Sequence, residues 1–216
     1  MKYIEKTPSP DFFEGWKQRF QEQHGSQPTY HDLKGQVKAR LKQYLLEEQG
    51  YLCCYCMANI EVTSDSSHLE HFIPRADGRN HPHSLQFQDV ELGYQNLFLS
   101  CNGEWCDESH CGKYKDSTTA LMLVSPASTE VQDAFSYTVS GDIDGTTPKA
   151  MTSVRVLNLQ SAALKRHRKT AIWNSGFFDD DFPDEKDALI ELYSSRDSDG
   201  KFTPFCEAIL FVMKNA

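Results

Sequence analysis

The sequence predicts an α+β protein in which helices surround a small, irregular, metal-stapled centre. Two observations lead to this prediction. Stretches near both ends carry apolar residues at helical spacing, and six of the seven cysteines fall between positions 53 and 111. A clustered, odd set of cysteines in a chain without an export signal is typical of metal binding rather than of a disulfide framework. The expected organisation is a helical segment over 1–50, a zinc-bound core over 51–120 and a mostly helical region over 121–216.

The individual elements follow from local signals. Ser9 and Pro10 form a cap and first turn, and leucines recur at helical spacing before Gly50, a natural stop. By these rules and by apolar content, helices are expected over 9–24, 29–50, 160–175, 183–194 and 203–214. Residues 94–100 are expected to be a short helix or strand leading into Cys101, 117–124 and 135–140 to be strands, and 141–148 to be a turn.

Charge and hydropathy restrict the class of protein. The net charge of −9 argues against a protein that coats nucleic acid by bulk positive charge. The charge is uneven, because residues 53–116 and 178–216 are acidic while 154–175 contain basic and no acidic side chains. No apolar run approaches the roughly 20 residues of a membrane span, and no apolar signal segment opens the chain. We therefore expect a soluble, cytoplasmic protein with no membrane contact.

The cysteines predict a structural zinc site. Cys53 and Cys56 form a Cys-x-x-Cys knuckle, whose two thiolates reach one Zn²⁺. The second pair is Cys101 with either Cys106 or Cys111, and Gly112 after Cys111 suits a knuckle turn, which favours Cys101 and Cys111. Four cysteine ligands would close the coordination sphere and leave no position for chemistry. Cys54, Cys106 and Cys206 are then non-ligands, and the alternative to the whole site is a set of buried free thiols.

Polar motifs lie in a fixed order between and after these cysteines. They are Glu70-His71-x-x-Pro74, then Asn96-Leu97, then His110-Cys111-Gly112-x-x-Lys115. This order resembles the HNH endonuclease family, whose ββα-metal fold carries the Glu-His pair on the first strand of a hairpin. The resemblance implies a metal-dependent nuclease whose core is surrounded here by helices. We expect DNA as the substrate ahead of RNA.

The resemblance also implies roles for these residues. His71 is the general base, Glu70 a ligand of a catalytic Mg²⁺ or Mn²⁺, and Asn96 positions the His71 ring, while Lys115 is placed to hold a phosphate. The third letter of the family pattern is His or Asn after the second-knuckle cysteine, and this chain departs from it with Gly112. His110 is the preferred substitute as a metal ligand, and His68 and His83 are the alternatives.

Further residues narrow the resemblance. The opening Met1-Lys2-Tyr3-Ile4-Glu5-Lys6, the Cys54-Tyr55-Cys56 run and Leu157-Asn158-Leu159, with Leu164 and Arg168, are similar to the HNH nuclease subunit of Septu-type anti-phage systems, also found with retrons. The likeness implies an effector of anti-phage defence. Its partners would be an ABC/SMC-type ATPase subunit and, in retron systems, a reverse transcriptase with its RNA–DNA.

One basic run is a candidate contact surface. Lys165, Arg166, Arg168 and Lys169 would spread over more than one face of a helix, so one face is free for nucleic acid or for a partner. A solvated helix face is the alternative. For the whole chain, the rival functions are a non-catalytic zinc-stabilised adaptor, which would not need Glu70 and His71, and a zinc hydrolase of small molecules, which four cysteine ligands would exclude.

Overall fold

The computed structural model describes residues 1–75, 90–105, 108–115 and 122–216. Its helices confirm the main periodic stretches of the sequence. Over these ranges they are α1 (Asp11–His24), α2 (Gly35–Glu48), α3 (Pro148–Val156), α4 (Ala162–Trp173), α5 (Phe182–Ser194) and α6 (Cys206–Lys214). Each helix of the described part is too short or too polar to cross a membrane.

The strands are short and pair in antiparallel twos, which together with the helices confirms the α+β class. Where the chain is described, β1 (Ser67–His71) pairs with β2 (Leu97–Cys101), β3 (Glu104–Trp105) with β4 (Glu108–Ser109), and β5 (Phe135–Tyr137) with β6 (Ile143–Gly145). In the first pair Ser67 lies opposite Cys101 and Glu70 opposite Phe98. The predicted strand at 117–124 falls mostly outside the described residues, and β5 replaces the one at 135–140.

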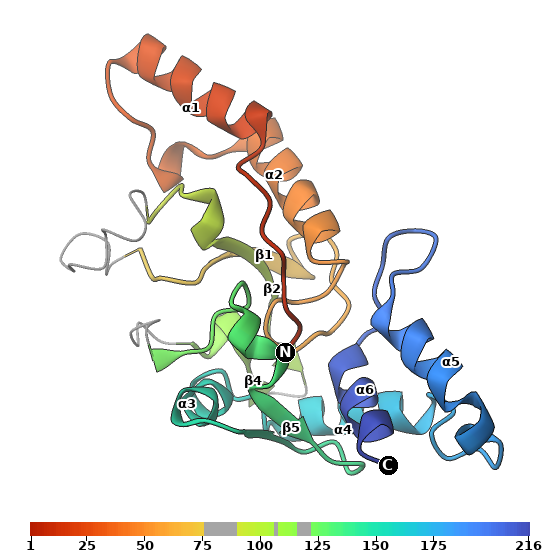
Figure 1. Ribbon diagram of the computed structural model, residues 1–216. Coiled ribbons are helices and arrows are strands. Elements are labelled where there is room, and N and C mark those ends of the chain that lie inside the picture. The colour runs from red at the N-terminus through yellow and green to blue at the C-terminus, as the bar shows by residue number, and fades with distance from the viewer. Residues whose placement is uncertain (76–89, 106–107, 116–121) are drawn as a thin grey trace.

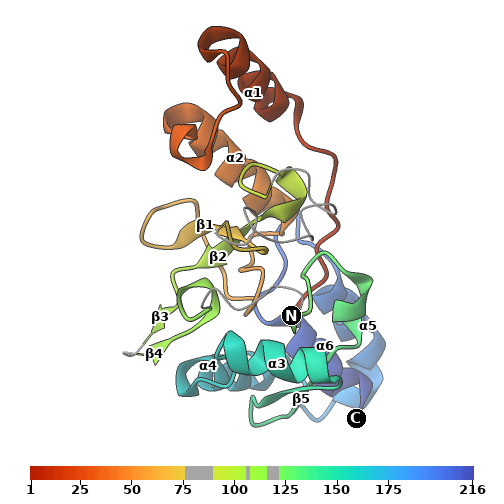
Figure 2. The ribbon, with the colours of Figure 1, turned by 90° about the vertical axis from the view of Figure 1, so that its left-hand side faces the viewer.

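Figure 1 shows the arrangement, with α1 and α2 at one end, β1 and β2 in the middle and α3 to α6 at the other end. The second view agrees, and it places β3 and β4 between the central pair and the C-terminal helices (Figure 2). The N-terminal segment runs extended beside β2 before α1 begins. The central strands therefore lie between two helical layers, and this is where the candidate site residues are.

α2 holds the central strands in place through its C-terminal half. Its buried face carries Leu41, Leu45 and Leu46, the residues whose spacing predicted the helix. Just after the helix, the buried Gln49 side chain donates from Nε2 to the Leu99 carbonyl (2.9 Å) and accepts at Oε1 from the Leu99 N–H (2.7 Å). The Gln49 amide therefore makes the two hydrogen bonds that a further strand would make to Leu99 of β2, so that these buried backbone groups are paired.

α3 is a helix that the sequence pattern does not predict, since the pattern indicates a turn over 141–148 and its next helix only from residue 160. Its start is well signalled: the Thr147 hydroxyl accepts from the Ala150 N–H (3.2 Å), and Pro148 occupies the first turn. The expected turn lies mainly in β6 and the residues before it. Gly145 is required there, since a Cβ would come within 2.1 Å of the Met151 nitrogen.

Candidate metal centre and active site

Four cysteines meet in the core as a candidate metal centre. The Sγ atoms of Cys53, Cys56, Cys101 and Cys111 all lie within 4.8 Å of one another, and all four side chains are buried. A tetrahedral Zn–S₄ centre with bonds of about 2.3 Å requires sulfur atoms about 3.8 Å apart. The distance from Cys56 Sγ to Cys101 Sγ is 3.8 Å. The predicted ligand set is thus brought together, and Cys106 lies outside the described residues.

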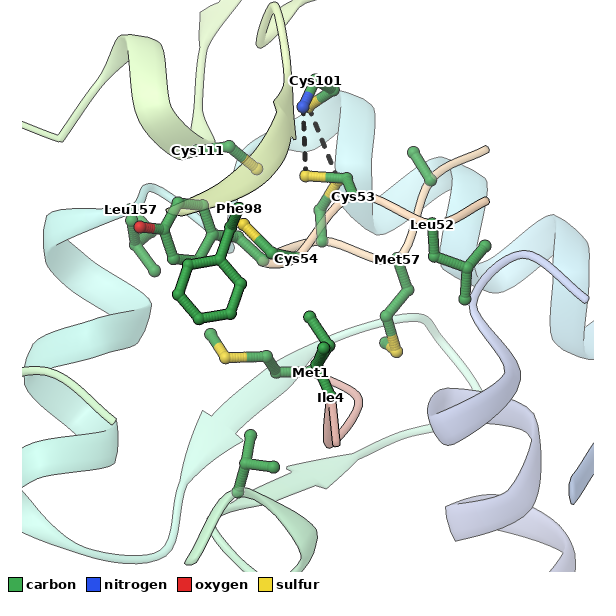
Figure 3. Close-up of a cluster of buried hydrophobic side chains, with 14 of the residues drawn as sticks. Met1, Ile4, Leu52, Cys53, Cys54, Met57, Phe98, Cys101, Cys111 and Leu157 are labelled. Carbon is green, nitrogen blue, oxygen red and sulfur yellow. Dashed lines mark hydrogen bonds between the residues drawn. The ribbon is translucent and has the colours of Figure 1, made fainter. Parts of the chain in front are cut away.

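Each pair of cysteines is positioned by backbone hydrogen bonds. The knuckle turn is closed from Met57 N–H to the Cys53 carbonyl (3.1 Å), with Met57 in the left-handed region at φ 66°. The Cys101 N–H, at the end of β2, donates to Cys53 Sγ (3.3 Å). Cys111 is positioned by the residue after α3, since its N–H donates to the Leu157 carbonyl (2.8 Å). Figure 3 shows the thiols inside the apolar core, beside Phe98 and Leu157.

The neighbouring thiols donate hydrogen bonds to Cys53, which favours the thiolate form of that residue. Burial raises the pKa of the Cys53 thiol, but hydrogen bonds from Cys101, Cys111 and the other neighbouring thiols outweigh burial and lower that pKa well below its usual value. Burial raises the pKa of Cys111, which stays a donor. Because the thiolate is the form that binds metal, the cluster is prepared for a soft cation such as Zn²⁺.

His110 belongs to this cysteine centre by its contacts. Its Nδ1 lies 3.2 Å from Cys111 Sγ and 3.9 Å from Cys101 Sγ, and the residue is fully buried. Its backbone N–H donates to the Gly103 carbonyl (2.8 Å), which fixes it in the turn before Cys111. The imidazole that the structure brings to Glu70 is instead that of His68. His83, the other alternative, lies outside the described residues.

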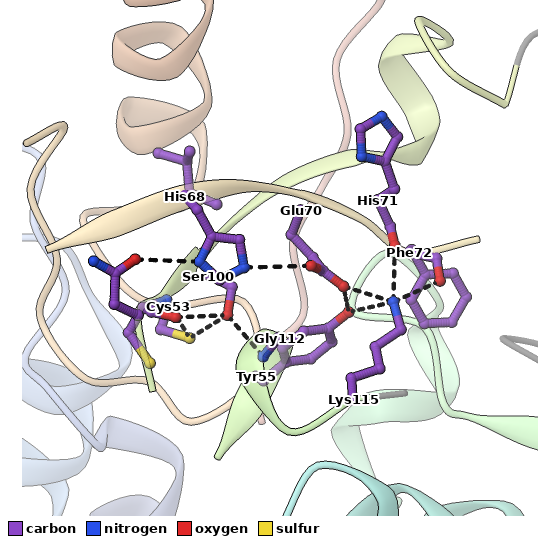
Figure 4. A network of polar contacts seen from close by, with 12 residues as sticks. Cys53, Tyr55, His68, Glu70, His71, Phe72, Ser100, Gly112 and Lys115 are labelled. Carbon is purple, nitrogen blue, oxygen red and sulfur yellow. Dashed lines mark hydrogen bonds and ion pairs between the residues drawn. The ribbon is translucent and has the colours of Figure 1, made fainter. Parts of the chain in front are cut away.

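Glu70 is the centre of a second buried polar network, drawn in Figure 4. Its Oε1 accepts from Lys115 Nζ (2.6 Å) and from the Tyr55 hydroxyl (2.9 Å), while its Oε2 faces His68 Nε2 at 3.5 Å. Burial raises the pKa of Glu70, but His68, Lys115 and Tyr55 outweigh burial and lower it. Glu70 is therefore a carboxylate at neutral pH, as a ligand of a hard divalent cation must be.

Lys115 is bound inside the protein. Besides Glu70, its ammonium donates to the carbonyl oxygens of His71 (2.7 Å) and Phe72 (2.9 Å), and 4% of its side chain is exposed. An ammonium has three donors; these three acceptors make its shortest contacts, and the Tyr55 hydroxyl lies within 3.3 Å as well. The sequence assigned Lys115 to a phosphate, whereas its contacts make it the partner that neutralises Glu70 and ties it to the end of β1.

His71 leaves the opposite face of β1 from Glu70, as neighbouring residues of a strand do (Figure 4). Its Nε2 lies 2.9 Å from the Glu91 carbonyl oxygen. Because a carbonyl only accepts, Nε2 carries the proton and Nδ1 of the neutral ring keeps its lone pair. Burial lowers the pKa of His71, with Arg75 and Lys115 adding repulsion. His71 is therefore a neutral base at pH 7.

Asn96 acts on His71 through the backbone. Its fully buried amide accepts from the Ile73 N–H (2.7 Å) and donates to the carbonyls of Ile73 (3.0 Å) and Val90 (2.7 Å). Val90 precedes Glu91, whose carbonyl binds the His71 ring. The Asn96 amide thus ties Ile73, after β1, to Val90, next to the residue that orients the His71 ring. Asn96 was predicted to bind the ring itself, whereas it acts through the neighbouring backbone.

The basic run on α4 requires a correction at Arg168. Its side chain is 1% exposed and its Nε donates to the Gly141 carbonyl (2.7 Å), so Arg168 is an internal residue and not a surface contact. Lys165 forms an ion pair with Asp142 (2.6 Å). Lys169 lies over the exposed Trp173 ring. The helix packs by this face because Gly141 has no side chain, and a Cβ there would meet Lys165 O at 2.2 Å.

Sequence reasoning missed several residues of the site. Tyr55 was noted only as part of the knuckle, yet its hydroxyl reaches Glu70, and Asn102 pairs with His68 (Oδ1 to Nδ1, 3.3 Å). Ser100 joins two cysteine segments, since its hydroxyl accepts from the Gly112 N–H (3.2 Å) and lies 3.7 Å from Cys53 Sγ. The signal that could have found His68 is strand alternation, which puts it on the face of Glu70.

Comparison with known proteins adds no assignment to this geometry. No protein-family model matches the chain, and no curated protein matches it. The function is therefore argued from the residues of the site and from their contacts.

Proposed function

We propose that the chain is a metal-dependent HNH endonuclease that hydrolyses phosphodiester bonds of nucleic acid, with DNA favoured over RNA. The observation that carries the proposal is the pair at the end of β1. His71 is a neutral imidazole whose Nε2 binds the Glu91 carbonyl, so that Nδ1 is the atom that can accept a proton. The neighbouring Glu70 is a buried carboxylate. Hydrolysis of a phosphodiester requires both groups, one to take a proton from water and one to hold a cation.

The two side chains have separate roles because one is a neutral imidazole and the other is a carboxylate. His71 accepts the proton of the attacking water at Nδ1, and the Glu91 carbonyl keeps the ring in the tautomer that permits this. Glu70 holds Mg²⁺ or Mn²⁺, which supplies positive charge to the scissile phosphate and the leaving oxygen. Lys115 and Asn96 are positioning residues in this scheme, the first for Glu70 and the second for His71.

Zinc at the four cysteines is structural in this proposal. The segment between Cys53 and Cys56 delivers Tyr55 to Glu70, and the turn that begins at Cys111 delivers Lys115 to the same carboxylate. A metal that fixes both cysteine segments therefore also fixes two contacts of the active site. The four thiols fit a closed structural centre and not a catalytic zinc, which needs an open position.

The proposal extends to a defence complex with an ABC/SMC-type ATPase subunit. The rings of Trp173 and Phe178 contact each other at a tilt, with centroids 4.7 Å apart, and both residues are exposed, 55% and 45%. Aromatic residues are enriched at protein interfaces, and an exposed pair of them marks a candidate contact surface. This surface is our candidate for the ATPase contact, and co-purification of a Trp173→Ser, Phe178→Ser variant with the ATPase tests it.

The nuclease proposal is tested by replacing His71 with alanine. The wild-type chain, alone and with the ATPase subunit, should cleave DNA or RNA when Mg²⁺ or Mn²⁺ is supplied, and excess EDTA should stop cleavage. His71→Ala should lose cleavage by a factor of about 10² to 10⁴ while keeping its fold and zinc content. The exposed His31→Ala is the matched control. Equal cleavage by His71→Ala, or no cleavage by the wild-type complex, would favour the non-catalytic adaptor instead.

A further inference from the structure

Gly112 occupies the position where the HNH pattern has a side-chain ligand, and the structure explains the glycine. A Cβ at Gly112 would lie 2.5 Å from His68 Nε2 and 2.9 Å from Glu70 Oε2. The backbone of Gly112 is outside the left-handed region, so its conformation does not require glycine. What requires glycine is the space, which the imidazole of His68 and the carboxylate of Glu70 take.

The orientation of the His68 ring is fixed from its far side. Asn102 Nδ2 donates to the Ser64 carbonyl (2.6 Å), so the amide oxygen of Asn102 is the atom that faces His68 Nδ1 at 3.3 Å. An amide oxygen only accepts, and Nδ1 must therefore carry a proton. The Nε2 atom, with its lone pair in the neutral ring, is left facing Glu70 Oε2 at 3.5 Å (Figure 4).

Two acceptor atoms at this distance repel each other unless a cation lies between them. A proton on Nε2 is one solution and a divalent ion is the other, since an ion about 2.1 Å from each donor fits between atoms 3.5 Å apart. The opposite oxygen of Glu70 is engaged by Lys115 and Tyr55, which leaves Oε2 to the ion. His68 is 34% exposed in its side chain, so water can complete the coordination.

We propose that His68 Nε2 and Glu70 Oε2 together bind one divalent cation, and that His68 supplies from β1 the ligand that the HNH pattern supplies from the position of Gly112. The inference deepens the proposed function by naming the second protein ligand of its catalytic metal. Asn102 orients that ligand, as outer-shell partners of metal-bound histidines do.

Direct measurement of Mn²⁺ binding tests this assignment without relying on cleavage. Zinc-loaded protein is titrated with Mn²⁺, and free Mn²⁺ is followed by electron paramagnetic resonance. Glu70→Gln and His68→Ala should each weaken binding by about tenfold or more, and Asn102→Ala by a smaller factor. Gly112→Ala should weaken binding like His68→Ala, because its Cβ displaces the same ring. His31→Ala and Gly15→Ala, whose Cβ meets only the end of the Arg19 side chain, are the controls.

The outcomes separate this inference from the nuclease proposal. If His68→Ala binds Mn²⁺ as the wild type does while the wild type cleaves nucleic acid, the His68 assignment is wrong and the nuclease proposal stands. If binding depends on His68 but the wild type, alone and with the ATPase subunit, does not cleave nucleic acid, the metal site stands and the nuclease proposal fails. Failure of the wild type to bind Mn²⁺ at millimolar concentration would mean that the His68–Glu70 contact is a protonated ion pair, which overturns the inference.

Discussion

The cysteine centre and the Glu70 network share the β1–β2 pair and differ in how they are built. The first consists of four identical groups that are all buried and within 4.8 Å of one another. The second collects a carboxylate, an ammonium, a phenol and an imidazole from three segments, and its His68 is partly exposed. A closed set of thiolates suits a metal that stays, whereas an unlike set with one side open suits an ion that takes part in binding or chemistry.

The comparison also shows an order of dependence. Tyr55 and Lys115 reach Glu70 from segments that the cysteines anchor. No cysteine, in contrast, has its position set by the Glu70 network in the contacts described. The cysteine centre should therefore survive damage to the Glu70 network, while the reverse should not hold. Two perturbations of decreasing size test this asymmetry, and a third, smaller one tests the base of the proposed reaction.

The largest effect should come from losing a metal-binding thiol. Cys56→Ser removes one of four ligands from a centre that, in small zinc domains, contributes roughly 10 kcal/mol to folding. We expect zinc content to fall and Tm to decrease by about 10 °C or more, with the Glu70 site lost as a consequence. Zinc analysis and thermal unfolding measure both. The buried Cys206→Ala, outside the cluster, is the control and should cost about 1 kcal/mol. A zinc-free wild type that is equally stable would contradict the order of dependence.

Breaking the Glu70 ion pair should have an intermediate effect that leaves zinc in place. Lys115→Met keeps the size of the side chain but leaves Glu70 buried without its cation, which costs about 3–5 kcal/mol in denaturant unfolding. Adding Glu70→Gln should recover part of that loss, because the uncompensated charge is then removed. Zinc content should stay at the wild-type level in both variants. A Lys115→Met cost below about 1 kcal/mol, or loss of zinc, would show that the two centres are not arranged as described.

The sequence was sufficient for the cysteine centre because one pair of ligands has the spacing of a knuckle and a glycine marks the turn of the other pair. The knuckle at Cys53 and Cys56 fixes two positions within one turn, and Gly112 correctly favoured Cys111 for the second pair. Helices with clear apolar periodicity, such as α2, were predictable for the same reason: the pattern and the structure have the same period.

The Glu70 network was less predictable because it depends on which face of a strand each residue occupies. His110 was favoured as the substitute ligand by its position beside Cys111, yet the turn directs it to the thiols, and alternation along β1 brings His68 to Glu70 instead. Arg168 was misjudged for a similar reason. A basic run shows that a helix is charged, but only the packing of Gly141 against α4 shows which member is inside.

The smallest effect should be a shift in the pH dependence of cleavage, and it concerns His71 rather than either buried centre. Burial, Arg75 and Lys115 lower the pKa of His71, so the ring stays neutral to a lower pH than an ordinary histidine of pKa 6.5. Cleavage should therefore fall on the acidic side along a limb centred below pH 6.5. Arg75→Gln removes one repulsive charge, which raises the pKa of His71 and moves the limb to higher pH. The exposed Arg155→Gln, on α3, is the control and should leave the limb unmoved. A limb above pH 6.5, or one that Arg75→Gln leaves in place, would mean that the group titrating in the reaction is not His71.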